Sequence, residues 1–133
     1  MDSLWARAIL VACGGGLGAV LRWGLDSGIS WLWPAAALRF PVGIFVVNGL
    51  GCLVFGLILG LAGSFETLGS GRRLFLLTGV LGGFTTFSTF SHDTVRLLGA
   101  GQTGLALINA VGSVVVGLGA VLGGLAVGRW LAG

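Results

Sequence analysis

Residues 40–65 read FPVGIFVVNGLGCLVFGLILGLAGSF, an uncharged tract between Arg39 and Glu66. A helix needs about 20 apolar residues to cross the hydrocarbon core of a bilayer. The tract is long enough for one complete crossing, and we place the predicted span at residues 41–64. Its one amide side chain, Asn48, lies in the middle of an otherwise apolar run.

The rest of the chain has the same character. Of its 133 residues, 56% are hydrophobic and 8% are charged, a composition that a soluble domain cannot keep wetted. Three further stretches predict spans at residues 4–25, 73–98 and 102–130. The sequence therefore predicts an all-α integral membrane protein with four transmembrane helices, a single domain covering residues 1–133 and both termini on one side of the membrane.

The segment from Asp26 to Leu38 is too short and too broken to cross on its own. Trp31, Trp33 and Pro34 suit an interfacial position, because tryptophan rings favour the level of the lipid headgroups. We therefore expect this segment to lie along the membrane surface between the first two spans.

The positive charges are spread singly, which excludes a nucleic-acid surface with clustered basic and aromatic residues. They fit anchors at the membrane–water boundary, where long side chains reach water. Orientation normally follows an excess of basic residues on cytoplasmic loops, but here the two sides are nearly balanced. The chain therefore inserts either with a weak preference for one orientation or in both orientations. Insertion in both orientations makes an antiparallel dimer possible. One side carries Arg7, Arg72, Arg73 and Arg129, and the other carries Arg22, Arg39 and Arg96.

Glycine is abundant, with 27 residues, and several glycines are spaced four apart within the predicted spans. Small residues at this spacing allow helix backbones to approach closely in lipid. The pattern predicts helix contacts but says nothing of what passes between the helices. The pairs are Gly14 and Gly18, Gly56 and Gly60, Gly79 and Gly83, Gly119 and Gly123, and Gly124 and Gly128.

The third span contains GGFTTFSTFS at residues 82–91. Paired glycines followed by hydroxyl residues predict a local helix break in mid-membrane, because hydroxyls compete for backbone hydrogen bonds. Such breaks are tolerated where the backbone lines a cavity or holds an ion. The alternative is a packing face rich in serine and threonine.

Two other features of the spans have a structural and a functional interpretation. Phe87 and Phe90 share a helix face, and their positive ring edges suit a small anion, although such pairs usually serve packing. The Asn48 amide needs partners, which are either an anion or a neighbouring helix. Asn109 and Ser113 in the fourth span raise the same choice.

The sequence indicates neither an enzyme nor a metal site built from cysteine and histidine. Cys13 and Cys52 lie in apolar stretches, and the single His92 has only Asp93 beside it. A proton-coupled transporter of small cationic drugs is the main alternative to a channel, but it requires an acidic residue deep in a span. Asp26 and Asp93 are nearer the span ends. A membrane scaffold explains the glycines but not the polar stretch.

Three motifs in order give the chain a resemblance over nearly its whole length to the Fluc-type fluoride channels, the CrcB family. They are GGGLGAVLR at Gly14 to Arg22, GxxxxNG at Gly43 to Gly49, and GGxTTFSTFS at Gly82 to Ser91. The resemblance implies a passive fluoride channel that exports fluoride across the bacterial cytoplasmic membrane and relieves fluoride toxicity. It also implies an antiparallel, dual-topology homodimer in membrane lipid, enclosing two fluoride pathways.

The same resemblance implies roles for single residues. A structural sodium ion at the dimer centre is expected on the backbone carbonyls of Gly82 and Thr85. The fluoride pathway is expected to include Asn48, Phe87, Phe90, Ser88, Thr89, Ser113 and, near the vestibule, Arg22. Ile44 departs from the family, which often has threonine there, and this removes a hydroxyl from the expected pathway.

Overall fold

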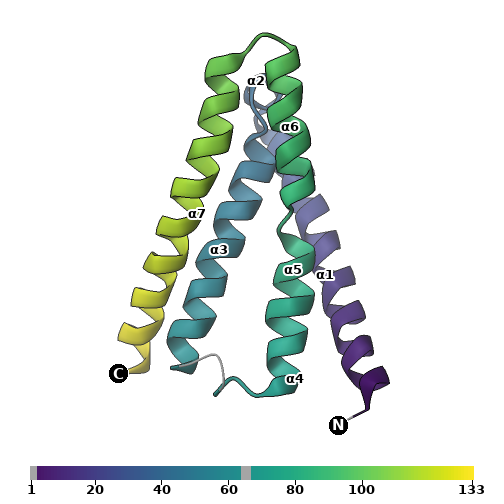
Figure 1. The fold of residues 1–133 in the computed structure, drawn as a ribbon, viewed down its shortest axis with the longest axis vertical. Coiled ribbons are helices and arrows are strands. Elements are labelled where there is room, and N and C mark those ends of the chain that lie inside the picture. The colour runs from purple at the N-terminus through teal and green to yellow at the C-terminus, as the bar shows by residue number, and fades with distance from the viewer. Residues whose placement is uncertain (1–2, 64–66) are drawn as a thin grey trace.

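The structure, a computed structural model, describes residues 3–63 and 67–133, and all regular elements in these ranges are helices. Four helical stretches are long and apolar enough to cross a membrane, so the protein is a multi-pass membrane protein (Figure 1). In chain order the elements are α1 (Leu4–Leu32), α2 (Pro34–Arg39), α3 (Val42–Ala62), α4 (Ser70–Arg73), the π-helical η1 (Leu74–Leu81), α5 (Gly82–Phe84), α6 (Phe87–Gly99) and α7 (Thr103–Ala132).

The helices begin and end close to the predicted spans, except near the first connection. The span predicted for residues 4–25 belongs to a helix that continues to Leu32, so the expected surface segment does not start at Asp26. Only the short helix α2 remains of it, and Pro34 begins α2 because proline fits the first helical turn. The second span ends at Ala62, where Gly63 takes a positive φ of 74°. Residue 64 of that prediction lies outside the described residues.

The pair α3 and α7 has the most extensive contact between two elements of the described chain, and glycines bring the later halves of the two helices together. A Cβ at Gly56 would overlap the carbonyl oxygen of Val121, and one at Gly124 would overlap that of Leu53. A Cβ at Gly60 or Gly128 would lie 2.5 Å from a carbonyl of the other helix. The backbones thus meet directly, which is the arrangement that small residues allow in lipid.

A second glycine contact joins α1 to the third helical stretch. Gly14 and Gly18 of α1 face the backbone around Gly79, Val80 and Phe84. The predicted contact role is therefore confirmed for these pairs. Gly119 and Gly123 make no such contact within the described chain, where an added Cβ at either would meet no atom within 4 Å.

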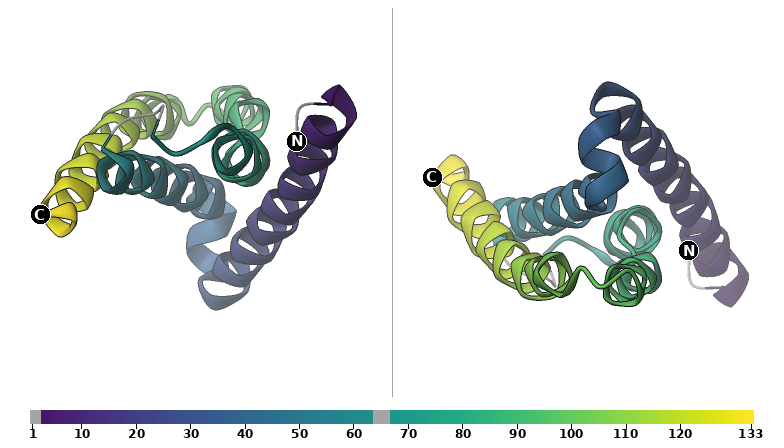
Figure 2. Two further views of the ribbon diagram at one scale, coloured as in Figure 1. Left: turned by 90° about the horizontal axis from the view of Figure 1, so that it is seen from below. Right: turned by 90° about the horizontal axis from the view of Figure 1, so that it is seen from above.

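The two termini lie at one end of the molecule, as expected, and α2 and the α6–α7 connection lie at the other (Figure 1). Seen along the long axis, the third helical stretch runs between α1 and the α3–α7 pair (Figure 2). It changes neighbours along its length, because η1 and α5 pack on α1 whereas α6 packs on α7.

Candidate functional site

The third helical stretch is interrupted at Thr85 and Thr86, between α5 and α6. Thr85 has φ −82° and ψ 155°, and Thr86 has φ −148° and ψ 121°, both in the extended region. Backbone groups that would bond within a continuous helix need other partners at this point. We call these two residues the junction.

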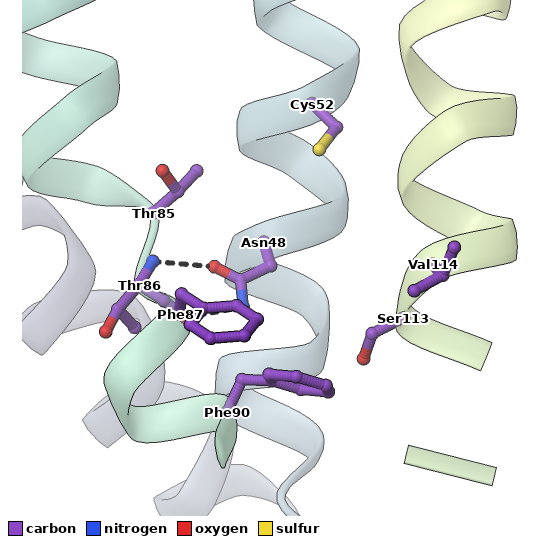
Figure 3. Close-up of a pocket in the computed structure, with 8 residues that line it drawn as sticks. All are labelled: Asn48, Cys52, Thr85, Thr86, Phe87, Phe90, Ser113 and Val114. Atoms are coloured by element: carbon purple, nitrogen blue, oxygen red, sulfur yellow. Dashed lines mark hydrogen bonds between the residues drawn. The ribbon is translucent and has the colours of Figure 1, made fainter. Parts of the chain in front are cut away.

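Asn48 supplies partners for the junction from α3. Its Oδ1 accepts a hydrogen bond from the Thr86 N–H at 2.8 Å, and its Nδ2 donates to the Thr86 carbonyl at 3.1 Å (Figure 3). The amide therefore pairs with both backbone groups of one residue, as a neighbouring strand would. The primary amide has a second N–H besides the one bonded to Thr86. The sequence left an anion or a neighbouring helix as the partner of the Asn48 amide. The structure shows the bond to a neighbouring helix.

Thr86 is the centre of the local hydrogen bonding, although it was not among the predicted site residues. Its side chain caps α6 by accepting from the Thr89 N–H at 3.3 Å. Its hydroxyl also lies 3.2 Å from the Ser88 hydroxyl and 3.1 Å from that of Thr89. Threonine is often found at helix N-caps, and this preference is the sequence signal that could have identified Thr86.

A hollow of about 280 Å³ opens beside the junction, and we call it the Asn48 hollow. It contains amide, hydroxyl, thiol and aromatic groups but no charged side chain. The rings of Phe87 and Phe90 are tilted by 43° with centroids 5.4 Å apart, and Phe87 is 79% exposed in the single chain. The lining residues are Asn48, Cys52, Thr85, Thr86, Phe87, Phe90, Ser113 and Val114 (Figure 3).

Ser113 brings α7 into the wall of this hollow. Its Oγ is buried and, within residues 3–63 and 67–133, has no hydrogen-bond partner. A buried polar atom without a partner costs about 1–3 kcal/mol. Such an atom beside a hollow marks a place where a polar ligand gains an interaction that the folded chain leaves unused.

Other residues of the predicted pathway lie away from the Asn48 hollow. Thr89 lines a separate hollow of about 210 Å³ towards the α2 end, together with Asp26, Ile44, Asp93 and Arg96. We call it the Asp26 hollow. Ser88 is exposed and bonded to Thr86, and Arg22 lies on α1 one turn before Asp26. The structure therefore brings together only part of the predicted set: Asn48, Phe87, Phe90 and Ser113.

The Asp26 hollow is lined by three charged residues, Asp26, Asp93 and Arg96. The Asp93 carboxylate lies 3.5 Å from the Arg96 guanidinium and 3.7 Å from the His92 ring, and both partners are largely exposed. Asp26 approaches the Cα side of Gly43, where a Cβ would overlap its carboxylate oxygen. The acidic residues thus belong to a helix-end hollow and are separate from the uncharged junction.

The junction also leaves several carbonyls without their helical donors, among them those of Gly82 and Thr85. In a continuous helix the Thr86 N–H would donate to Gly82 O, but it donates to Asn48. The Thr89 N–H would donate to Thr85 O, but it donates to the Thr86 hydroxyl. Gly82 and Thr85 both line a third hollow of about 180 Å³. Backbone oxygens are the kind of ligand that a hard cation such as sodium prefers.

Comparisons with known proteins agree over almost the whole chain. Residues 9–125 match a family model described as "CrcB-like protein, Camphor Resistance (CrcB)". A Chloroflexus aurantiacus protein named "Fluoride-specific ion channel FluC" is 46% identical over 129 residues, covering 94% of this chain and 97% of the relative. Relatives of the same name from Thermus thermophilus and Maridesulfovibrio salexigens are 47% and 40% identical, each covering 92% of this chain and at least 95% of their own length.

Proposed function

The chain belongs to the CrcB-like family, and we propose that it is a fluoride channel that exports the ion passively across the bacterial cytoplasmic membrane and relieves fluoride toxicity. The observation that carries the proposal is the Asn48 hollow, which offers polar donors and aromatic edges but no charged side chain. A small, strongly hydrated anion needs substitutes for its water, yet a fixed positive charge would hold it too tightly to leave.

The pathway that we propose passes the rings of Phe87 and Phe90, whose edges carry partial positive charge. The second N–H of Asn48 and the Ser113 hydroxyl are donors along it. The Ser113 hydroxyl supports this role because it is buried without a partner in the described chain. Ser88 and Thr89 extend the hydroxyl track towards the Asp26 hollow, and Arg22 attracts anions at that end.

A structural sodium ion at Gly82 and Thr85 belongs to the same proposal. Its support is the pair of carbonyl oxygens whose helical donors bond elsewhere. Two copies related by a two-fold axis would contribute four such oxygens. When bound, the ion would supply a positive charge that attracts anions without placing a basic side chain in the pathway.

We also propose an antiparallel homodimer with the junction near the middle of the bilayer. Gly82, Phe87 and Ser88 are exposed in the single chain. In lipid an exposed break in a helix is costly, because backbone groups find no water there. A second copy would cover this face, and the nearly equal arginine counts at the two ends favour insertion in both orientations.

The drug-transporter alternative is not favoured, because Asp26 and Asp93 line a hollow at the end of the helices. Liposomes loaded with fluoride and containing the purified protein test the function directly. We expect fluoride release through the protein without a proton gradient and little release of chloride. Release equal to that of protein-free liposomes would refute the channel, and release that requires a proton gradient would favour a transporter.

Topology is tested separately with a reporter at the C-terminus in intact cells. We expect about equal signals from both sides of the membrane, as nearly balanced charge predicts. A signal from one side alone would reject the inverted homodimer while leaving the channel activity itself to the liposome assay.

A further inference from the structure

A second asparagine, Asn109 of α7, also holds α6. Its side chain is buried, with 2% exposed, in a helix whose outer face is apolar. Its Nδ2 donates to the Thr94 hydroxyl at 2.8 Å and lies 3.5 Å from the Phe90 carbonyl oxygen. A buried amide requires such partners, and these belong to the element that carries the two phenylalanine rings.

Thr94 connects this amide to Phe90. Its hydroxyl donates to the Phe90 carbonyl at 2.8 Å and accepts the Asn109 N–H. Each hydrogen bond polarises the next, so a connected chain of them is worth more than separate contacts. The peptide group that follows the Phe90 Cα is therefore bonded both to the next turn of α6 and to α7.

The two asparagines hold α6 against the α3–α7 pair. Asn48 on α3 binds the N-cap residue of α6, and Asn109 on α7 binds its second turn. The helices α3 and α7 are joined by glycine contacts between backbones. Beyond the junction α6 no longer packs on α1, so these polar contacts and its packing on α7 are what determine its position.

We propose that Asn109 is a positioning residue for Phe90, which sets the ring against the Asn48 hollow through Thr94 and does not itself touch the ion. The proposal rests on the proposed fluoride channel. Ser113 lies one turn after Asn109 on the same face of α7 and lines the hollow. One face of α7 thus carries both a wall of the hollow and the contact that sets the opposite ring.

The test measures fluoride and chloride flux per reconstituted channel for Asn109→Leu and Thr94→Val. We expect each to lower fluoride flux by about tenfold. Each removes about one hydrogen bond that holds the Phe90 ring in place, and the free energy of one such bond corresponds to about that factor. The fluoride-to-chloride flux ratio should fall as well. Thr94→Ser keeps the hydroxyl and should restore the wild-type flux ratio, and the double variant should be no worse than Asn109→Leu alone.

Leu97→Ala is the matched control, because the Leu97 side chain is apolar and is buried in α6 with 1% exposed. It should lower the melting temperature in detergent without changing the flux ratio. A wild-type ratio in folded Asn109→Leu would refute the proposal. If that variant does not fold, equal ratios in Thr94→Val and Thr94→Ser refute it instead. Absence of fluoride flux in the wild-type protein would refute the channel itself and is seen in the same assay.

Discussion

Two regions of the molecule differ in how their backbones are held. One is the contact between α3 and α7, and the other is the junction in the third helical stretch. Along α3 and α7, glycines remove side chains so that two regular helices touch through their backbones. At Thr85 and Thr86 the helix is interrupted. The Asn48 side chain bonds the backbone N–H and carbonyl of Thr86, and the Thr86 hydroxyl accepts from the Thr89 N–H. The first region has almost no polar side chains, and the second depends on them.

The difference follows from the bilayer as a solvent. Lipid offers no hydrophobic force to press helices together, so close contact and hydrogen bonds must do so. The glycine contact makes a rigid support out of regular helix. The junction leaves helical geometry where Asn48, on the regular helix α3, pairs with Thr86. The interrupted stretch is therefore supported by a neighbour that keeps its own helical geometry.

Replacement of Asn48 by aspartate should have the largest effect and breaks the junction while leaving the glycine contact intact. The carboxylate cannot donate to the Thr86 carbonyl and places a negative charge beside the hollow. We expect fluoride flux to fall by about a hundredfold or more, because the lost hydrogen bond to Thr86 and the added negative charge both oppose fluoride passage. Cys52→Ala, one turn along α3 in the same hollow, should keep nearly wild-type flux in the liposome assay. Unchanged flux in Asn48→Asp would exclude Asn48 from the pathway.

Replacement of Gly124 by alanine tests the other region. The added Cβ would overlap the Leu53 carbonyl and lie 2.8 Å from the Leu57 nitrogen, so α3 and α7 must separate. We expect a loss of about 1–3 kcal/mol in unfolding free energy, measured by denaturation in detergent. Gly123→Ala is the neighbouring control, because a Cβ there meets nothing within 4 Å. Equal stabilities of the two variants would contradict the direct backbone contact.

The smallest effect distinguishes the two threonines of the junction. Thr86→Val removes the cap of α6 and should lower the unfolding free energy by about 1 kcal/mol. Thr85→Val removes a hydroxyl that donates back to Leu81 in the preceding turn at 2.9 Å, and should cost less than about 0.5 kcal/mol. Melting curves in detergent measure both. A larger loss for Thr85→Val would show that the Thr86 hydroxyl is not the centre of the junction.

Much of the fold could be predicted because membrane helices are encoded locally. Uncharged tracts of the required length located the four spans, and Gly56, Gly60, Gly124 and Gly128 were recognisable as contact residues by their spacing. The first helix continues to Leu32, beyond the span predicted for residues 4–25 and past Asp26. In the structure that carboxylate lies beside Gly43 in a hollow at the helix end, where a charge does not end the helix.

The site was predicted less completely than the spans. The polar stretch after Gly82 stood out by composition, and so did Asn48, but the partner of Asn48 is Thr86, 38 positions along the chain. Spacing along one helix cannot reveal a bond to another. Thr86 and Thr94 were overlooked as well, although both are central to how α6 is held. The cap that Thr86 provides is local, but its pairing with Asn48 and the bond of Thr94 to Asn109 join different helices.

By itself, then, the sequence determined which segments enter the membrane, where backbones are free to touch and where a helix is weakened, since length, small side chains and hydroxyls act within a few residues. Only the tertiary structure decided which carbonyls lose their donors, which hydroxyl stays unpartnered and where the third stretch passes from α1 to α7. Those outcomes depend on the angle and height at which separate helices meet, and no pattern within a few residues of the sequence specifies either.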